Sequence, residues 1–380
     1  MRANTISRRL AIIVAIVFLL TAFFVFPSAA NAIEKVPDTS AQSIALLECS
    51  TNTVLYARSA HIRLPMASTT KVMTALVAIK YGNLDAMIQI PDEAVGIEGS
   101  SIYLQKGEKL TLRDLLYGLM LRSGNDAAVA IAHYIGGSID GFSKLMNETA
   151  KSIGAYNTNF VNPHGLPAEN HYTTAYDLAL ICCEAMKNET FKAIVSSQYH
   201  RTTTGFAPRT MMNKNKLLWE YEGGIGIKTG FTKAAGKCLT FAAERNGMTV
   251  VGVVLNCPAM FPDAKELLNY CFENYEMYNI VKKGTVAIRV EVGRSNGQLL
   301  PLVTTKDIVV PVKKSEGAKF IPKIFVDNGI NAPVYKGTVL GRLDIYCSDK
   351  LVSSCELVSA QDIFVPSISY YIKRILSFWC

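Results

Sequence analysis

The chain carries few charged side chains and none of the dense basic tracts that bind nucleic acids. Asp, Glu, Lys and Arg make up 18% of its 380 residues, and the formal net charge is +8. A mild positive excess favours anionic surfaces such as lipid and argues against nucleic acid as a partner. No C-x-x-C spacing and no H-E-x-x-H helix occurs in the sequence. We therefore predict neither a metal ion nor a cofactor.

Cysteine is present, but not in the arrangement of a small disulfide scaffold. The nine cysteines are scattered, odd in number and mostly flanked by apolar residues: Cys49, Cys182, Cys183, Cys238, Cys257, Cys271, Cys347, Cys355 and Cys380. We predict buried free thiols, with disulfide bridges as the alternative.

Histidine is scarce, and the surroundings of a Ser-His-Asp triad are missing. Only five histidines occur, and no G-x-S-x-G elbow is present. We interpret His164 and His171 as structural residues of one loop. Asp177 follows Thr174 by three positions and is predicted to act in a helix cap rather than as a catalytic acid. The remaining three histidines have no supporting motif.

An apolar run follows basic residues at the amino terminus. Three arginines precede the run Leu10–Phe26, and the small residues "ANA" end at Ala32. This pattern predicts a secretory signal peptide over residues 1–32, so the folded part is expected outside the cytoplasm. Because the run is slightly long for a signal peptide, an uncleaved membrane anchor is the alternative.

Strands flank a helical part in the first folded region, residues 33–280. Residues 43–59 predict two short strands around a turn, and helical periodicity follows. Strand patterns then return, and Asn246-Gly247 supplies the positive-φ pair of a tight hairpin. The segment 262–278 predicts an amphipathic helix that covers the sheet. The fold class is therefore α/β (α+β), with one antiparallel sheet closed by the first and last segments and a helical lobe.

The last hundred residues differ in pattern. Alternating apolar and polar residues predict a small all-β domain over residues 281–363. The tail, residues 364–380, places apolar and aromatic side chains on one helical face, with Lys373 and Arg374 away from it. At about 15 residues such a helix is too short to cross a bilayer but suits its surface. We predict that this helix contacts a membrane surface; docking on its own domain is the alternative.

Ser68 and Lys71 lie three positions apart at the start of an apolar helical stretch, "PMASTTKVMTALVAI". Residues at this spacing share a helix face, so the lysine Nζ can reach the serine Oγ. Burial and a second cation lower a lysine pKa, and a neutral lysine is the base that a serine nucleophile requires. Taken alone, the pair has a plainer interpretation, a serine cap beside a lysine whose amine reaches solvent.

Two further short motifs follow. Ser123-x-Asn125 lies in a loop between two helical stretches, where serine and asparagine are ordinary turn residues. Lys228-Thr229-Gly230 lies late in a strand, and its glycine allows the backbone to approach a ligand closely. The order S-x-x-K, S-x-N, K-T-G is close to the motif set of penicillin-binding proteins and class A β-lactamases. The three motifs together therefore favour chemistry over the separate structural interpretations.

The chain resembles the low-molecular-mass penicillin-binding proteins that are D-alanyl-D-alanine carboxypeptidases. The resemblance extends from the signal peptide through the motifs and the β domain to the amphipathic tail. The surroundings of the motifs agree as well: "LPMASTTKVMTALVA", "LLYGLMLRSGNDAAVAIA", "NPHGL" ahead of "HYTTAYDLA", and "GIGIKTGFTKAAGKCL". The resemblance implies a DD-peptidase/β-lactamase-like catalytic domain, an exported enzyme at the outer face of the membrane or in the wall, and acylation by β-lactams. The implied substrate is the peptidoglycan stem peptide that ends in D-Ala-D-Ala.

The resemblance also implies roles for the first two motifs. Ser68 is expected to be the nucleophile that carries the acyl group, and Lys71 the general base that removes its proton. Ser123 is expected to relay a proton to the departing amine. Asn125 is expected to hydrogen-bond the substrate backbone and to orient Lys71.

The third motif is expected to bind the substrate. Lys228 attracts the terminal carboxylate and holds Lys71 uncharged by repulsion, and Thr229 offers its hydroxyl to the same carboxylate. Beyond Gly230, the backbone N–H of Phe231 and that of Ser68 are expected to form the oxyanion hole.

Two positions depart from the family pattern. Relatives often carry histidine where this chain has Phe231, which puts side-chain contacts to the substrate in doubt. Lys214 stands where relatives often have an arginine thought to reach the substrate carboxylate. Lysine lacks the bidentate fork of arginine, so Lys214 is a weak candidate for substrate binding.

The sequence leaves three competing functions open. The first is a serine β-lactamase, but a class A enzyme would carry a glutamate in E-x-x-L-N spacing, whereas Glu169 is followed by "NHYT". The β domain also argues against a β-lactamase. The second is a D-Ala-D-Ala endopeptidase of the same superfamily, and the third is a wall protein that binds β-lactams without turnover.

Overall fold

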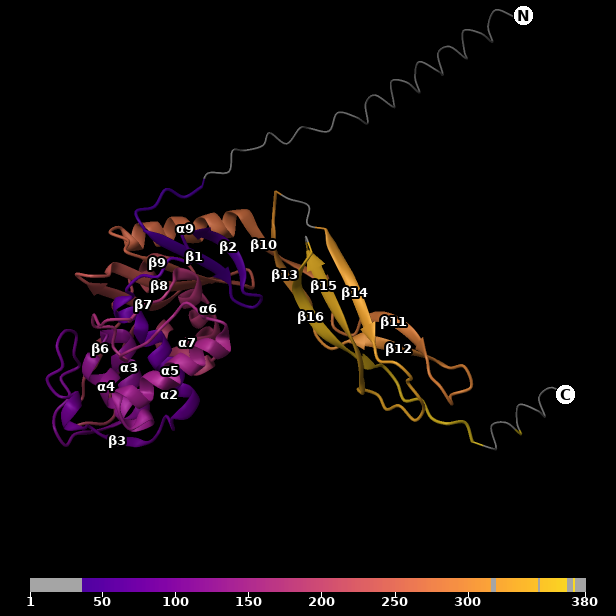
Figure 1. Ribbon diagram of the computed structural model, residues 1–380, viewed down its shortest axis with the longest axis horizontal. Coiled ribbons are helices and arrows are strands. Elements are labelled where there is room, and N and C mark those ends of the chain that lie inside the picture. Colours follow the sequence, from indigo (N-terminus) through magenta and orange to yellow (C-terminus); the bar gives the residue numbers. More distant parts are fainter. Residues whose placement is uncertain (1–35, 316–318, 348, 368–371, 373–380) are drawn as a thin grey trace, which may run out of the picture. The chain divides into compact units, whose positions relative to one another are not determined.

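The computed structural model describes residues 36–315, 319–347, 349–367 and 372 (Figure 1). The predicted signal peptide, residues 1–32, and most of the tail, residues 364–380, lie outside the described residues. None of the described helices is long and apolar enough to cross a membrane.

A five-stranded antiparallel sheet with the order β2–β1–β9–β8–β7 forms the centre of the first region. In that order the strands span Thr53–Arg58, Ser43–Glu48, Met248–Leu255, Gly236–Arg245 and Gly224–Thr232. β1 pairs with β9, with Ile44 opposite Val254, so the first and last strands of the region are neighbours. The predicted closure of the sheet is confirmed. The predicted hairpin is confirmed too, because Asn246 and Gly247 have φ values of 50° and 75° between β8 and β9.

Helices pack on one face of this sheet and enclose α2 (Figure 1). The helices are η1 (Ala67–Thr70), α2 (Lys71–Tyr81), η2 (Asp92–Ala94), α3 (Leu112–Tyr117), η3 (Gly118–Arg122), α4 (Asn125–Gly136), α5 (Ile139–Ile153), α6 (Ala175–Met186) and α7 (Glu189–Ser196). The short helix α8 (Leu217–Glu220) instead contributes Leu217 to the apolar cluster of the other face. Two small hairpins accompany them, β3 (Met87–Gln89) with β4 (Lys109–Thr111) and β5 (Tyr199–Arg201) with β6 (Thr210–Met212).

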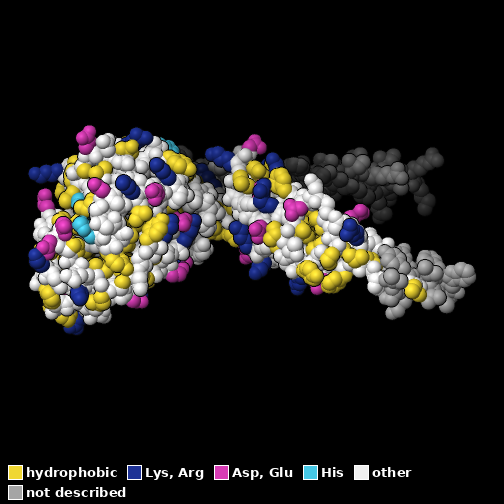
Figure 2. All heavy atoms as spheres, turned by 60° about the horizontal axis from the view of Figure 1, so that its bottom comes forward, with side chains coloured by type: hydrophobic (Ala, Val, Ile, Leu, Met, Phe, Trp, Pro, Cys, Tyr) yellow, Lys and Arg dark blue, Asp and Glu magenta, His cyan; other side chains and the backbone are white. Residues whose placement is uncertain are grey.

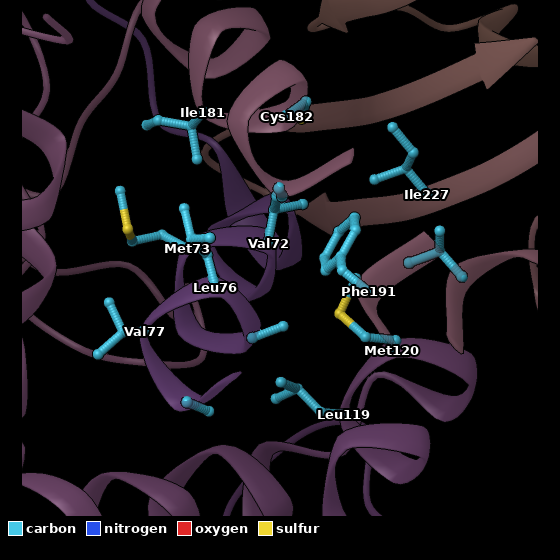
Figure 3. Packing of buried hydrophobic residues seen from close by; sticks show 14 of the residues in the cluster. Val72, Met73, Leu76, Val77, Leu119, Met120, Ile181, Cys182, Phe191 and Ile227 are labelled. Atoms are coloured by element: carbon cyan, nitrogen blue, oxygen red, sulfur yellow. The ribbon is translucent and has the colours of Figure 1, made fainter. Parts of the chain in front are cut away.

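The first eight residues of α2 are all buried, including Lys71 at its start. Val72 and Met73 of α2 pack in one apolar cluster with Ile181 of α6 and Phe191 of α7 (Figure 3). A helix that is apolar on every side is held by packing rather than by its own propensity. The helix that carries the first motif is therefore rigidly placed.

Side-chain caps define the starts of two helices, and the second of them was predicted. The Thr111 side chain accepts a hydrogen bond from the Asp114 backbone N–H at the start of α3. The Thr174 side chain does the same for Asp177 at the start of α6, which confirms the capping role of this pair. The Asp177 carboxylate also accepts from the Asn157 backbone N–H at 2.6 Å.

The helix α9 (Met260–Asn274) packs on the other face of the sheet, against β8 and β9. The prediction of a helix there is confirmed, but its end was predicted at Tyr278 and lies at Asn274. Residues Tyr275–Val281 instead form β10, which pairs with β13 (Ile308–Lys313). Backbone pairing with a distant strand overrides the local helical pattern here.

The remaining strands form a five-stranded antiparallel sheet with the order β11–β12–β16–β15–β14. In that order they span Val286–Glu291, Leu299–Thr304, Lys350–Ser359, Val339–Cys347 and Phe320–Val326. Their shared core is aliphatic, with Leu300, Leu302, Ile345 and Leu357 fully buried. The predicted all-β character of this region is confirmed.

Charge and cysteine are distributed as the composition suggests. On the face shown in Figure 2, acidic and basic side chains are interspersed. The eight cysteines that the structure describes are free thiols, and all except Cys347 are buried. Among the described residues, no three His, Cys, Asp or Glu side chains gather where they could hold a metal ion.

Candidate active site

Ser68 and Lys71 meet where η1 passes into α2. The Lys71 Nζ donates to Asn125 Oδ1 at 2.7 Å and to the His164 carbonyl oxygen at 2.6 Å, and it lies within hydrogen-bond distance of Ser68 Oγ, at 3.0 Å. Lys71 is completely buried, so its amine does not reach solvent. Ser68 caps neither η1 nor α2. The plainer interpretation of the pair, a cap beside a solvent-seeking lysine, is therefore wrong.

The environment of Lys71 disfavours its charged form. Its pKa lies well below the ordinary value because the amine is buried, and the nearby cations Lys228 and Lys214 lower it further. Asp126 acts in the opposite direction but is outweighed. All three hydrogen-bonding partners of the Lys71 amine are uncharged oxygens, so the amine has no carboxylate partner. Burial, more than the repulsion from Lys228 that the sequence suggests, lowers the pKa of this amine.

Lys228 is also buried, on β7, with 1% of its surface exposed. Burial, and to a smaller extent Lys214, lowers the pKa of Lys228 to about 7. Its Nζ donates to the Thr229 carbonyl oxygen at 3.0 Å. The buried Lys228 in turn lowers the pKa of the buried Lys71, from across the region between α2 and β7.

Gly230 allows β7 to lie directly against η1. A Cβ at this position would be 3.1 Å from the Ser68 backbone nitrogen and 3.2 Å from the Ala67 Cβ. Contacts this short are tighter than almost any real Cβ makes, so only glycine fits without a shift. The next residue, Phe231, is 66% exposed, and Thr229 is half-buried. The backbone after Lys228 thus passes beside the backbone N–H of Ser68.

Ser123 lies at a strained turn between η3 and α4. η3 is a π-helical turn, and Ser123 has a φ of 65°, in the left-handed region that residues other than glycine seldom adopt. Both features cost conformational energy and recur at functional sites. η3 contacts α2 and β7. The turn that carries Ser123 therefore lies between the helix of Lys71 and the strand of Lys228.

Asn125 begins α4 and is bonded at both ends of its carboxamide. Its Oδ1 accepts from Lys71, and its Nδ2 donates to the Glu98 carbonyl oxygen at 2.6 Å. Its backbone N–H donates to the Ser100 carbonyl oxygen at 2.7 Å. The loop at residues 98–100, which no motif indicated, therefore orients the carboxamide.

Lys214 is exposed, yet it lies close enough to lower the pKa of both Lys71 and Lys228. Partial desolvation and the neighbouring Arg122 lower its own pKa. No local pattern singled out Arg122, although it directly precedes Ser123. All the residues predicted for the site are thus brought to one region: Ser68, Lys71, Ser123, Asn125, Lys214, Lys228, Thr229, Gly230 and Phe231.

The two loop histidines make hydrogen bonds within the fold, in keeping with the structural role predicted for them. His171 Nδ1 accepts from the Val161 backbone N–H, so its Nε2–H donates to Thr70 Oγ1 at 2.9 Å. Burial, followed by Lys71, lowers the pKa of His171 to about 4. Burial, followed by Lys71 and His171, lowers the pKa of His164 to about 3. Only the carbonyl oxygen of His164 touches Lys71, a contribution that a sequence motif cannot reveal.

Family comparisons agree with this geometry. Residues 30–259 match the family model D-alanyl-D-alanine carboxypeptidase, and residues 275–364 match the penicillin-binding protein 5 C-terminal domain. The carboxypeptidase DacF of Bacillus subtilis is 32% identical, over 89% of this chain and 90% of that protein. The carboxypeptidase DacA of Escherichia coli is 30% identical, over 98% of both.

Solved structures show the same relationship. Penicillin-binding protein 5 of Haemophilus influenzae aligns with a TM-score of 0.72 at 28% identity, covering 87% of this chain and 99% of that one. A mutant of the Streptomyces K15 DD-transpeptidase aligns with a TM-score of 0.60 at 38% identity, covering 63% of this chain and all of that one. The chain belongs to the D-alanyl-D-alanine carboxypeptidase family and is a serine-type hydrolase of peptidoglycan metabolism.

Proposed function

We propose that the enzyme removes the terminal D-alanine from peptidoglycan stem peptides through an acyl-enzyme on Ser68. One observation supports this most strongly: the Lys71 amine is buried among uncharged oxygens, and its Nζ lies 3.0 Å from Ser68 Oγ, within reach of the hydroxyl proton. A lysine in this setting is an uncharged base one helical turn from a hydroxyl. Acylation by penicillin, which is characteristic of the family, would use the same attack.

The reaction proceeds in two stages in this proposal. Ser68 Oγ attacks the carbonyl carbon between the two D-alanines while its proton passes to Lys71. The backbone N–H groups of Ser68 and Phe231 stabilise the oxyanion, and Ser123 hands a proton to the departing amine. Free D-alanine leaves, and the carbonyl stays on Ser68 as an ester. Water then attacks the ester, which releases the shortened peptide and restores the hydroxyl.

The substrate is oriented by groups on both sides of Ser68. Lys228 and the Thr229 hydroxyl receive the terminal carboxylate, beside the close approach that Gly230 permits. Asn125 shares its carboxamide between Lys71 and the substrate backbone. Lys214 adds positive charge near the same carboxylate, as a weaker contact.

The location that we propose for the chain rests on its two terminal segments. Residues 1–32 would direct export, and residues 364–380 would lie in the outer face of the membrane as an amphipathic helix. The catalytic domain, residues 33–280, and the all-β domain, residues 281–363, would then both be extracytoplasmic, next to the wall. Extracted from cells, the full chain is expected to float with lipid vesicles, whereas a chain ending at residue 363 should not.

The decisive experiment combines two products. The enzyme is incubated with a peptide ending in D-Ala-D-Ala to measure D-alanine release, and with penicillin to locate the adduct by mass spectrometry. We expect D-alanine release and a single slow-turnover adduct on Ser68, both absent in Ser68→Ala. Rapid sustained hydrolysis of a chromogenic cephalosporin would instead indicate a β-lactamase. Cleavage of crosslinked dimers without D-alanine release would indicate an endopeptidase, and an adduct without any peptide cleavage a binding protein.

A further inference from the structure

A strained loop, residues 98–104, lies over the start of α4. Tyr103 has a φ of 60°, and its side chain is 80% exposed. A left-handed tyrosine costs roughly 1 kcal/mol or more, so the surrounding structure must hold it. The buried Asp126 carboxylate does part of this: it accepts from the Ile102 N–H at 3.0 Å, the Leu104 N–H at 3.1 Å and Ser101 Oγ at 2.6 Å.

An ion pair outside all three motifs holds the other side of the loop. Arg209 lies between β5 and β6, about a hundred residues further along the chain. Its Nη1 and Nη2 donate to Glu108 Oε1 and Oε2 at 2.6 and 2.8 Å. Its Nε donates to the Ile102 carbonyl oxygen at 2.9 Å, and Nη2 also donates to the Tyr103 carbonyl oxygen at 3.0 Å. The guanidinium therefore fixes both carbonyls at the strained point.

The Glu108 side chain is itself fully buried, with no exposed surface. It also accepts from the Gln105 N–H at 3.1 Å and the Phe206 N–H at 2.9 Å. A Cβ at Gly205 would lie 2.6 Å from Glu108 Oε1, so the β5–β6 connection wraps closely around the pair. The ion pair is bidentate, and the two backbone N–H groups occupy the remaining acceptor positions of the carboxylate. The pair therefore fixes the relative orientation of the two side chains as well as attracting them to each other.

The loop transmits this geometry to the base. Its Glu98 and Ser100 carbonyls hold the two nitrogens of Asn125, and Asn125 Oδ1 holds the Lys71 amine. We propose that Arg209 and Glu108 are positioning residues for acyl transfer, which hold the loop so that Asn125 secludes and orients Lys71. The inference rests on the role proposed for Lys71.

The competing explanation is purely structural: the pair ties one hairpin to the helical lobe and contributes only stability. The two differ in their effect on the base. If the loop loosens, water reaches Lys71, and the burial that lowers its pKa is reduced. The uncharged fraction then appears only at higher pH. The remaining groups that face the amine stay in place: Lys228, Lys214, Asp126, His164 and His171.

The test uses the full chain and measures the rate of acylation by a fluorescent penicillin across pH, together with the melting temperature. In Arg209→Met we expect a loss of up to about a hundredfold. The acidic limb of the pH profile should also move to higher pH. Arg209→Lys restores the charge but not the fork, and should be intermediate. The control Leu267→Ala leaves a cavity between α9 and the far face of the sheet. It should lower the melting temperature and leave the acidic limb of the pH profile unchanged.

Two results would overturn the inference. One is a folded Arg209→Met protein whose acylation rate and acidic limb of the pH profile are those of the wild type. The other is an Arg209→Met protein that is acylated more slowly without any shift of the acidic limb, if Leu267→Ala lowers the acylation rate by the same factor at equal destabilisation. If Arg209→Met fails to fold, Ser101→Ala is the deciding variant, because it removes only the hydrogen bonds of Ser101 Oγ to Asp126 and to the Tyr103 N–H. We expect a several-fold lower acylation rate and the same shift of the acidic limb to higher pH. An unchanged rate and pH profile would refute the inference. Failure of the wild type to react with penicillin would refute the proposed function instead.

Discussion

The two motif lysines of the catalytic region and Asp344 of the β region are buried in opposite ways. In the catalytic region, Lys71 and Lys228 are at most 1% exposed, and their amines bond only to uncharged oxygens. In the β region, the buried Asp344 accepts from Arg342 Nε at 2.8 Å and from Ser354 Oγ at 2.7 Å. The second arrangement follows the rule that buried charges are paired. The first departs from it, and in the proposed mechanism this departure makes Lys71 the base.

Breaking the catalytic arrangement should have the largest effect. Lys71→Met removes the base while keeping an apolar side chain of similar length in the same cavity. We expect acylation by penicillin to fall by roughly a thousandfold, in the range that general-base removal causes. Stopped-flow fluorescence measures the rate. Lys283→Met, at an exposed lysine of the β region, is the matched control and should react like the wild type.

Damage to the β core should change stability and leave the chemistry alone. Leu343→Ala removes a side chain that is 3% exposed in the aliphatic cluster of the β region. We expect a loss of about 3 kcal/mol in the free energy of unfolding of this region. Calorimetry should show an earlier transition for it, while the acylation rate stays at the wild-type value. A matching loss of acylation would mean that the two regions are energetically coupled.

The buried Lys228 should make the catalytic region more stable as pH rises. Its pKa is about 7 in the folded protein against an ordinary value of 10.5, so between these values the unfolded chain binds more protons. Stability therefore increases with pH across this window and is lost as pH falls toward 7. At neutral pH, Lys228→Met should raise the free energy of unfolding by a few kcal/mol, with a flatter pH dependence. Urea titrations measure both, and a variant less stable than the wild type at neutral pH would contradict the cost ascribed to this burial.

Removing the β region should have the smallest effect on chemistry. The catalytic clusters and the β cluster share no residue, and the K15 DD-transpeptidase mutant aligns over its whole length with 63% of this chain. A chain that ends at Asn274, the last residue of α9, should be acylated within about twofold of the full chain. A tenfold loss would show that the β region supports the site.

The sequence predicted the parts of the fold that depend on local patterns. The first strand pair, the Asn246-Gly247 hairpin and the Thr174 cap each follow from a few adjacent residues. The end of α9 did not, because β10 is formed by pairing with a strand some thirty residues later. Local periodicity carries no information about such pairing.

The candidate site divides in the same way. Ser68, Lys71 and Lys228 stand in recognisable motifs, and their convergence could be anticipated. The His164 carbonyl could not, because any residue supplies one. Nor could the pair of Arg209 and Glu108, whose members lie 101 positions apart in the chain without a motif around either. The support of the site is a tertiary property, whereas its reacting groups are local.

The central claim is that Lys71 is an uncharged amine in the folded enzyme at neutral pH. Lysine-selective isotope labelling with NMR titration, assigned by the missing resonance of Lys71→Met, measures its charge directly. The account predicts a Lys71 signal that is already uncharged at neutral pH and becomes cationic only on acidification. A signal that stays cationic until the pH approaches the ordinary lysine value of 10.5 would contradict it.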